Sequence, residues 1–491
     1  MLYLDQLKQK YQLIIGYIGI ITIGAGIVLI IPLISLFFYT DEVSQGVYFI
    51  IPSAVSIFLG ILMTSRLKNR KVISLTVQDG GIIVVLSWIV AIIISSFPFT
   101  LSGMLNFTQA VFECTSGWTT TGLSVVDVTK APKVFLLWRS IMQFFGGAGL
   151  AVVMLSTIIG PLGMGLYTAE ARSDKLLPNI KKTTSLIMKI YSGYIIAGII
   201  LYVIAGMPIF DAINHSIAAV STGGFSTKVN SIGEYKSPII ELITIILMIL
   251  GTTNFAAHYL ILKGKVKRFF RIGEVRFMFF LMSLSIPLLA FYTLRGLYTS
   301  LGRSFRIAIF EATSAISTTG FSTVTYTNWN DFGIFVMVIL MIIGGGTGST
   351  AGGLKLYRAY VLIKSLLWNI KGFLLPKYGV KENYVFRPDG KFYIKDNSLV
   401  ELANFLTMYV ITYFIGVCII TLSGYPLRDA MFEIASSLST VGLSVGVTSA
   451  NASGVVLWTE SVLMLLGRLE FFVIFYTIAK VIKDTKLVLK K

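Results

Sequence analysis

The chain has 491 residues, of which 55% are hydrophobic and only 13% are charged, and its formal net charge is +18. A water-soluble globular protein cannot hide so much apolar surface, so that class is excluded. Long uncharged runs near or above the ~20 residues that cross a bilayer indicate a polytopic membrane protein. These runs fall within residues 12–38, 78–100, 185–207, 238–262 and 398–423.

The excess of basic residues is concentrated at every second boundary between apolar runs. The clusters lie at 66–71, 171–189, 263–276, 355–395 and in the C-terminal "KVIKDTKLVLKK". Basic loops are retained on the cytoplasmic side of a membrane, so the charge indicates topology and needs no nucleic acid partner. We expect a multi-pass protein of the cell inner or plasma membrane with both termini in the cytoplasm. Cys114 and Cys418 alone give no disulfide framework.

Taken in chain order, the sequence predicts two N-terminal helices and then four similar units. The first two helices are expected near 12–38 and 48–64, joined by a short turn with Asp41 and Glu42. Each later unit has a long helix, a short apolar segment, a Ser/Thr/Gly strip and another helix. The predicted divisions are 1–72 for the helix pair, then 73–170, 171–273, 274–396 and 397–491 for repeats 1 to 4, the last with a cytoplasmic tail.

The strips are the clearest internal repeat. They read "WTTTGLS" (118–124), "VSTGGFS" (220–226), "ISTTGFST" (316–323) and "LSTVGLS" (438–444). Their central glycines are Gly122, Gly224, Gly320 and Gly442. In every copy threonine stands two residues before the glycine and serine two residues after it. Such agreement across four windows about a hundred residues apart indicates a true fourfold repeat.

The segment before each strip, such as 305–316, is too short to span a membrane and predicts a half-helix that enters and returns. Four units in the same orientation point to a pseudo-fourfold axis along the membrane normal, unlike inverted repeats. A ring of backbone carbonyls on that axis can replace the water shell of an alkali cation, and glycine reaches the backbone angles this needs. The alternative is that small residues only allow close helix packing.

A second set of glycines follows 24–27 residues after the first, at 146–147, 251, 344–345 and 467. It predicts that the second helix of every unit is weakened near one depth, most of all at "GGGTGSTAGG" (344–353). The 344–353 segment lacks the G-K-[ST] ending of a phosphate-binding loop. A flexible break in the helix without a gating role is the alternative interpretation of this segment.

The four strips, "GGGTGSTAGGLK" (344–355) and "LLGRLEFF" (465–472) resemble the Trk/Ktr/HKT superfamily of potassium transporters over nearly the whole chain. The two additional N-terminal helices resemble its TrkH branch. The resemblance implies an all-α membrane protein with about ten transmembrane helices, four helix–pore-loop–helix repeats around one pore, a homodimer, and a cytosolic nucleotide-binding partner of the TrkA type. No cofactor is implied on this chain, because the nucleotide belongs to the partner.

The resemblance also implies site residues. The implied K⁺-binding selectivity filter consists of Thr120, Thr121, Gly122, Thr222, Gly223, Gly224, Thr318, Thr319, Gly320, Thr440, Val441 and Gly442. The implied gate consists of Gly344, Gly345, Gly346, Thr347, Gly348, Gly352, Gly353 and Arg468, the arginine being a positive barrier in the pore. Some relatives have serine at the first filter glycine and favour sodium, so glycine in all four strips favours potassium.

Acidic residues precede three of the glycines by nine positions, at Glu113, Glu311 and Glu433, and His215 takes this place in repeat 2. The carboxylates could bind ions directly, but we favour the interpretation that they accept backbone N–H bonds and support the filter. His215 and His258 are expected to be satisfied by hydrogen bonds. A buried charge within a membrane segment is costly, and Arg468 could alternatively pair with Glu460 or Glu470.

The sequence therefore predicts potassium uptake through a channel-like filter, gated from inside. Two alternatives within transport are a secondary transporter that couples K⁺ to H⁺ or Na⁺, and a Na⁺-permeable member of the same family. An enzyme is not expected, since neither an HExxH nor a GxSxG motif has suitable surroundings.

Overall fold

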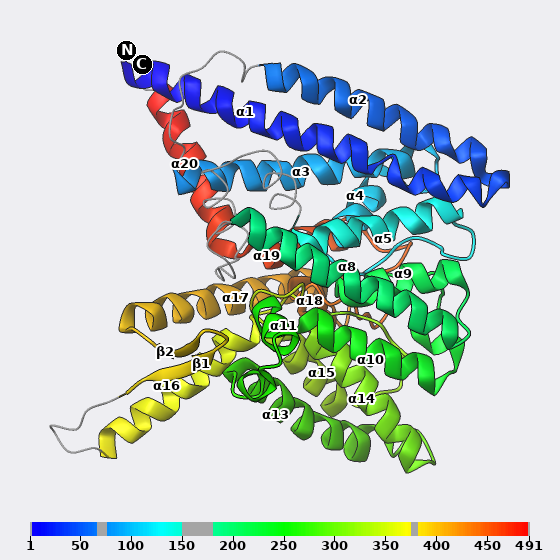
Figure 1. Ribbon diagram of the computed structural model, residues 1–491, viewed down its shortest axis with the longest axis vertical. Coiled ribbons are helices and arrows are strands. Elements are labelled where there is room, and N and C mark those ends of the chain that lie inside the picture. Colours follow the sequence, from blue (N-terminus) through cyan, green and yellow to red (C-terminus); the bar gives the residue numbers. More distant parts are fainter. Residues whose placement is uncertain (1, 66–75, 150–179, 375–381, 490–491) are drawn as a thin grey trace. The chain divides into compact units, whose positions relative to one another are not determined.

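The computed structural model describes residues 2–65, 76–149, 180–374 and 382–489, in which helices joined by loops and one two-stranded hairpin are present (Figure 1). The chain forms two compact units. Unit 1 contains Met1–Thr120, Ser124–Lys189 and Ser449–Lys491, and unit 2 contains Thr121–Leu123 and Ile190–Thr448. The predicted basic clusters at 66–71 and 171–179 lie outside the described residues, as do the predicted repeat boundaries at 72/73 and 170/171.

Unit 1 carries the N-terminal helices, the first repeat and the end of the chain. Its elements are α1 (Leu2–Val28), η1 (Ile31–Phe37), η2 (Thr40–Gly46), α2 (Val47–Thr64), α3 (Val77–Leu101), α4 (Phe107–Trp118), α5 (Lys133–Ala148), α19 (Gly454–Leu469), α20 (Phe471–Leu489) and the start of α8 (Ile180–Ile204). Helices α1 and α2 lie side by side, and α3 packs on both (Figure 1).

Unit 2 carries the rest of α8 and the remaining repeats. Its elements are α9 (Ile209–Val220), η4 (Ser231–Tyr235), α10 (Pro238–Thr252), α11 (Phe255–Leu262), α12 (Val266–Phe269), α13 (Gly273–Leu288), η5 (Leu289–Leu294), α14 (Leu301–Ser317), α15 (Asp331–Ile343), α16 (Leu356–Leu374), β1 (Tyr384–Arg387), β2 (Gly390–Tyr393), α17 (Asp396–Leu422) and α18 (Leu427–Leu438).

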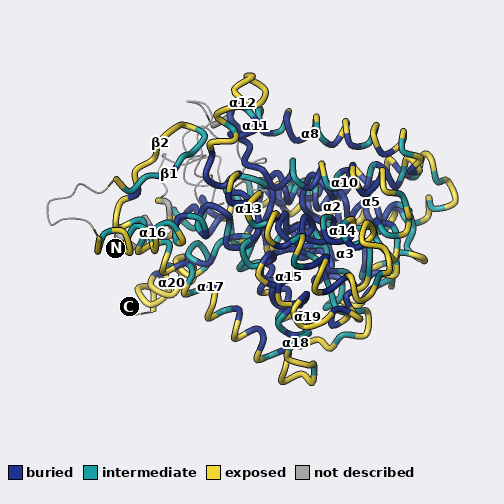
Figure 2. Tube along the Cα trace, turned by 90° about the horizontal axis from the view of Figure 1, so that it is seen from below, coloured by how far each residue is buried: buried dark blue, intermediate teal, exposed yellow. Residues whose placement is uncertain are grey.

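Six described segments are long and apolar enough to cross a membrane. They are Leu7–Phe37, Thr40–Thr64, Gln78–Leu101, Thr183–Ile204, Gly273–Leu294 and Asp396–Leu422. Two pairs of consecutive helices are bent at a short break, α10 with α11 by 108° and α19 with α20 by 101°. If each pair counts as one span, the described residues contain eight candidate membrane spans. Helix α8 presents exposed isoleucines at every fourth position, Ile196, Ile200 and Ile204, along one side (Figure 2). With these apolar spans, the chain is a polytopic all-α membrane protein.

The first predicted helix, 12–38, is confirmed as part of one apolar span, Leu7–Phe37, but its α-helical part is shorter at the C-terminal end than expected. The α-helix begins at Leu2 and ends at Val28, and the chain continues in 3-10 turns through η1 and η2. Pro32 is the physical reason, because it has no N–H to donate to the carbonyl of Val28. In the predicted acidic turn, Glu42 accepts hydrogen bonds from the backbone N–H of Lys133 (2.8 Å) and Val134 (3.2 Å), which fixes the start of α5.

Small residues set the contact between α1 and α2. A Cβ built on Gly26 would lie 3.0 Å from the carbonyl oxygen of Ser53, and the Ser53 hydroxyl donates to the carbonyl of Gly26 at 2.7 Å. A Cβ on Gly60 would meet the Gly19 carbonyl oxygen at 2.7 Å. Two backbones approach this closely only where side chains are absent or minimal, as is common between membrane helices.

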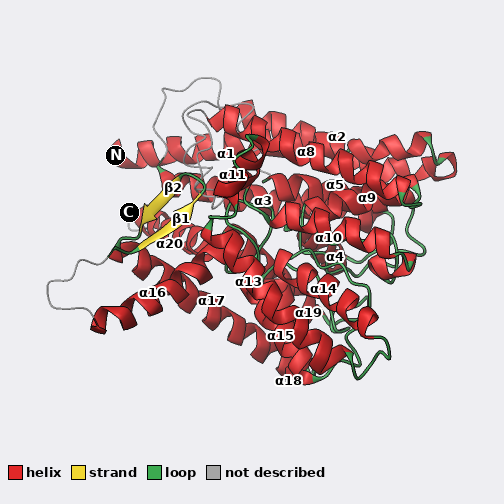
Figure 3. Cartoon of the chain, turned by 60° about the horizontal axis from the view of Figure 1, so that its bottom comes forward, coloured by secondary structure: helices red, strands yellow, loops and turns green. Residues whose placement is uncertain are grey.

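The basic tract at 355–395 forms α16 and the antiparallel hairpin β1–β2, which lie together in Figure 3. A small core joins them, since Tyr357 and Val361 of α16 pack with Val385 and Ile394. The guanidinium of Arg387 lies 4.3 Å from the ring centre of Tyr357 and 4.2 Å from that of Phe392. The described parts of this tract are therefore packed together, and part of their positive charge lies against aromatic rings.

The predicted half-helices exist as α4, α9, α14 and α18, of which three have 12 residues and α14 has 17. The second helix of each repeat also ends where the glycine pattern predicts a weak point. Helices α5, α10, α15 and α19 end at Ala148, Thr252, Ile343 and Leu469, each within two residues of a predicted weak point.

Candidate functional site: a ring of four strips and the loop beneath it

Each half-helix ends in the same turn, with threonine in the left-handed region where glycine is usual. Thr120, Thr222, Thr318 and Thr440 have φ of 56°, 51°, 53° and 52°. In repeat 4 the Thr440 N–H bonds the Ser437 carbonyl and the Val441 N–H bonds the Ser436 carbonyl, which is the Schellman pattern. A β-branched residue at positive φ is a genuine outlier. Its recurrence at four equivalent positions confirms the repeat.

The four glycines that follow close a ring within unit 2. A Cβ built on Gly122 would lie 2.3 Å from the carbonyl oxygen of Gly223, and one on Gly224 would lie 2.0 Å from that of Thr319. One on Gly320 would lie 2.0 Å from the carbonyl oxygen of Val441. Each glycine thus abuts the carbonyl that precedes the glycine of the next strip.

The last contact of the ring runs from repeat 4 back to repeat 1. A Cβ on Gly442 would lie 2.1 Å from the carbonyl oxygen of Thr121. All four glycines have positive φ, between 70° and 97°. A side chain at any of them would collide with backbone of the neighbouring strip, so both the backbone angle and the space require glycine.

The ring brings together backbone carbonyl groups from all four strips, those of Thr121, Gly223, Thr319 and Val441. Carbonyl oxygens are the groups that can replace the hydration shell of an alkali cation. The hydroxyls of Thr120 and Thr440 are buried, and neither has a hydrogen-bond partner among the described residues. Buried hydroxyls of this kind are expected to meet water or an ion.

The three predicted acidic residues lie behind the strips and accept hydrogen bonds from them. Glu113 accepts from the Ser124 hydroxyl (2.9 Å) and the Val125 N–H (2.9 Å). Glu433 makes the same pair of contacts with Ser444 (2.7 Å) and Val445 (3.2 Å).

In repeat 3, Glu311 accepts from the Thr323 N–H (2.8 Å) and the Thr323 hydroxyl (2.7 Å), and the hydroxyl of Tyr326 donates to its other oxygen. All three carboxylates are fully buried. Their contacts are those of braces, while their influence on ion selection stays a prediction.

Histidine takes the place of glutamate in repeat 2 and keeps the contact. One ring nitrogen of His215 lies 2.9 Å from the Ser226 hydroxyl, and the other lies 2.8 Å from the carbonyl of Asp211. His258 likewise contacts the Leu250 carbonyl (2.9 Å) and the Tyr194 hydroxyl (3.0 Å). No group of three or more metal-ligating side chains occurs among the described residues, and both cysteines are free thiols.

Several supporting residues were not identified from the sequence. Arg139 forms an ion pair with Glu113, with Nε and Oε1 2.8 Å apart and both side chains buried. Tyr326 and Thr448 both contact the acidic brace of their repeat. The sequence could have indicated Tyr326 and Thr448, because each lies six residues after the glycine of its strip. Arg139 occurs in repeat 1 alone, so the repeat could not reveal it.

The glycine-rich loop at 344–353 lies against the bases of strips 2, 3 and 4. The Thr350 hydroxyl contacts the carbonyls of Val220 (3.0 Å) and Gly251 (2.9 Å) and the Thr222 hydroxyl (3.2 Å). The Gly352 N–H donates to the Thr318 hydroxyl at 2.8 Å.

The loop also touches strip 4 and residues outside the strips. A Cβ on Gly352 would lie 2.1 Å from the Thr440 hydroxyl oxygen. Away from the strips, the Thr347 N–H donates to Glu274 at 3.1 Å and the Gly346 N–H to the Thr252 carbonyl at 3.0 Å. Every strip contact precedes the strip glycine, so the loop lies on the half-helix side of the ring.

Arg468 lies at the end of α19, and its guanidinium donates to the carbonyl of Gly146 at the end of α5. The next residue but one, Glu470, has φ of 58° and starts the sharp bend into α20. A Cβ on Gly146 would itself lie 2.0 Å from the carbonyl oxygen of Trp118, at the end of α4. Arg468 therefore joins the ends of α5 and α19, the second helices of repeats 1 and 4.

Comparison with known proteins agrees with this arrangement. Residues 45–490 match the TrkH family, described as cation transport proteins. The Trk system potassium uptake protein TrkG of Escherichia coli is 32% identical over 90% of this chain and 92% of its own length. An uncharacterized cation transporter of Methanocaldococcus jannaschii, MJ1485, is 29% identical over 99% of this chain and 98% of its length.

A solved structure is similar over nearly the whole fold. The crystal structure of the potassium transporter TrkH from Vibrio parahaemolyticus superposes with a TM-score of 0.81, at 27% identity, covering 95% of this chain and 98% of that one. The family is one of transport proteins rather than enzymes. With the matched region, the fold and the fourfold ring in agreement, the chain belongs to the TrkH family of cation transport proteins.

Proposed function

We propose that this protein takes up potassium across the cell membrane through the ring formed by the four strips. The main support for this proposal is the closed ring, in which the glycine of each strip abuts a backbone carbonyl of the next strip. Relatives of similar length are named as Trk system potassium uptake proteins, which supports K⁺ as the transported ion. In this proposal the filter residues are the twelve of the four strips, and K⁺ is cargo rather than a cofactor.

Flux into proteoliposomes with K⁺, Rb⁺ or Na⁺ as the only permeant ion tests the proposal. We expect K⁺ and Rb⁺ to enter along an imposed membrane potential and Na⁺ to enter much more slowly. Equal K⁺ and Na⁺ flux would refute the selectivity, and K⁺ flux that requires a proton or sodium gradient would replace the channel-like mode by coupled transport.

We also propose that the 344–353 loop gates this path from inside. Its support is the set of contacts that joins one loop to three strips, through Thr350, Gly352 and their partners. On the far side of the loop, Glu274 contacts its backbone at the start of α13, within the basic 263–276 segment. A cytosolic partner that moves this segment could therefore move the loop.

The partner in this proposal is a cytosolic nucleotide-binding subunit of the TrkA type, and the transporter works as a homodimer with both termini in the cytoplasm. The Trk system names of the relatives support a multi-subunit assembly. Co-purification with such a subunit, with and without ATP or ADP, tests the partner. Light scattering of the purified protein tests the dimer.

A further inference from the structure

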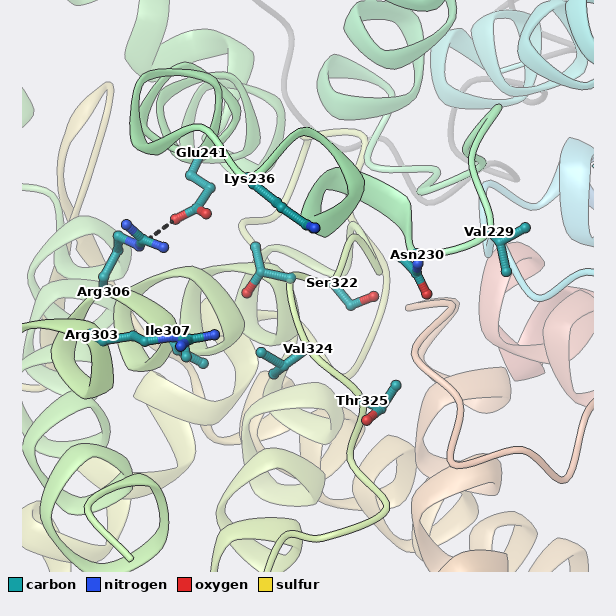
Figure 4. A pocket seen from close by; sticks show the side chains of 12 residues that line it. Val229, Asn230, Lys236, Glu241, Arg303, Arg306, Ile307, Ser322, Val324 and Thr325 are labelled. Atoms are coloured by element: carbon teal, nitrogen blue, oxygen red, sulfur yellow. Dashed lines mark ion pairs between the residues drawn. The ribbon is translucent and has the colours of Figure 1, made fainter. Parts of the chain in front are cut away.

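A separate pocket lies beside the ring, on the side away from the 344–353 loop. It has a volume of about 460 Å³ and lies between the chain that follows strip 2 and the chain that follows strip 3 (Figure 4). Its wall includes residues 322–325, which follow the strip glycine Gly320. The loop contacts precede that glycine, so the pocket and the loop lie on opposite sides of the ring.

The two chain segments of the wall are fixed to each other by backbone contacts. The Gly233 N–H donates to the Ser322 carbonyl at 3.1 Å, and the Ser322 N–H donates to the Ser231 hydroxyl at 3.3 Å. A Cβ on Gly233 would lie 2.5 Å from the Thr323 carbonyl oxygen. These backbone contacts fix one part of the pocket wall.

The charge of the pocket is unusual for a cation transporter. Lys236, Arg303 and Arg306 line it, and Glu241 is the single acidic residue among the lining residues. Glu241 pairs with Arg306 at 3.1 Å and is almost fully buried. Among the ion pairs of the described residues, Glu241 pairs with Arg306 and with neither Lys236 nor Arg303. Arg303 lies near the Glu241 carboxylate and its guanidinium lies 4.7 Å from the ring centre of Tyr298. Three cations face one carboxylate, so the pocket keeps a net positive charge.

The orientation of these groups suits an anion. In Figure 4 the side chains of Lys236 and Arg303 extend toward the space between them and the 322–325 segment. Lys236 is itself held at positive φ, 49°, at the end of η4, where its N–H bonds the Gly233 carbonyl. A lysine in the left-handed region is uncommon. Hydroxyls of Ser322 and Thr325 complete the wall with further donors.

We propose that this pocket binds a phosphate group carried by a small organic molecule, either a phospholipid headgroup or a soluble phosphate ester. Arginine and lysine with nearby hydroxyls are the donors that phosphate oxygens prefer. The volume lies within the ~300–1,000 Å³ of small-molecule sites, whereas a bare inorganic anion would fill little of it. Val229, Ile307 and Val324 give the apolar surface that the organic part would cover.

The proposal concerns binding and can be tested without any transport measurement. The detergent-purified, delipidated full chain is titrated with glycerol 3-phosphate by calorimetry, and its retention of phosphatidylglycerol against phosphatidylcholine is compared by native mass spectrometry. Binding of phosphatidylglycerol alone identifies a lipid headgroup, and binding of glycerol 3-phosphate identifies a soluble ester. Binding of neither probe overturns the proposal.

Variants separate the pocket from the rest of the surface. Arg303→Gln and Lys236→Gln are each expected to weaken binding roughly tenfold, since each removes a charge-assisted hydrogen bond. Lys130→Gln is the matched control, because Lys130 is an exposed lysine after strip 1; its binding should equal that of the parent. Unchanged binding in both pocket variants would contradict the assignment.

Glu241→Gln gives a change of opposite sign. It frees Arg306 and removes the one negative charge from the wall, so binding should tighten. If the Glu241–Arg306 pair only maintains the shape of the pocket, Glu241→Gln should weaken binding, as Arg303→Gln does. Such a loss of binding in both variants would overturn the proposal.

Discussion

Gly442 meets the backbone of Thr121, although the two residues stand in the last and the first repeat. The 2.1 Å between a Cβ built on Gly442 and the Thr121 carbonyl oxygen is the contact that closes the ring. Residues 121–123 accordingly belong to unit 2, while the half-helix before them and the chain after them belong to unit 1. The ring is therefore a single packed object in which each strip restrains the next.

The first prediction concerns the ring glycines. In Gly320→Ser the new Cβ would lie 2.0 Å from the Val441 carbonyl oxygen, so that strip 3, strip 4 or both must shift. We expect K⁺ flux to fall and the ratio of K⁺ to Na⁺ flux to decrease, because carbonyl positions set the preference for the ion. Sole-ion flux in proteoliposomes measures both quantities.

A control separates crowding from backbone strain. Gly424 also has positive φ, 94°, but no atom lies within 4 Å of its built Cβ. Gly424→Ser carries the strain without the collision and should keep the parental flux ratio. An unaltered ratio of K⁺ to Na⁺ flux in Gly320→Ser would contradict the proposal that strip 3 forms part of the filter.

Much of this site follows from the sequence because the repeat supplies four aligned copies. The glycines, the threonines before them and the acidic residues nine positions earlier are local in the chain, and their roles depend on backbone angles and short-range contacts. Half-helices and the ends of the second helices follow from segment length and glycine content in the same way.

Features that depend on one repeat, or on contacts distant in the chain, were not predicted. Arg139 neutralises Glu113 across 26 residues and has no arginine counterpart in the other repeats. The end of α1 at Val28 depends on Pro32 inside an otherwise apolar run, and hydropathy alone cannot detect it. The contact of Arg468 with Gly146 joins residues 322 positions apart.

The second prediction concerns the buried ion pair. Arg139→Met leaves Glu113 as an uncompensated buried charge, so the protein should lose about 3–5 kcal/mol of stability. The double variant Glu113→Gln/Arg139→Met removes both charges and should recover much of that loss. Thermal melting in detergent measures this, with Lys130→Gln as the control at an exposed pair. Equal losses in the single and double variants would mean that packing of Arg139, not its charge, matters.

The third prediction concerns the tie between the loop and the strips. Thr350→Val removes the hydroxyl that contacts Val220, Gly251 and Thr222. If the loop gates the path as proposed, the loss of about 1–2 kcal/mol should shift its equilibrium away from the observed position roughly 5- to 30-fold. K⁺ flux without the regulatory partner should rise accordingly.

Serine is the matched replacement at this position. Thr350→Ser keeps the hydroxyl and loses only a methyl group, so its flux should stay near that of the parent. If valine lowers the melting temperature but leaves partner-free flux unchanged, the loop braces the ring and does not gate it.

The last prediction concerns Arg468. Its guanidinium donates to the Gly146 carbonyl, at the point where α5 ends and near the sharp bend after α19. If Arg468 is a positive barrier to cations, Arg468→Ala should raise K⁺ flux in the absence of the partner, while Arg468→Lys, which keeps the charge, should raise it less. If the residue serves only to join the two helix ends, Arg468→Ala and Arg468→Lys should both lower thermal stability without a gain in flux. An unchanged flux in Arg468→Ala would exclude the barrier, because a charge that acts as a barrier must alter the local cation concentration on the path.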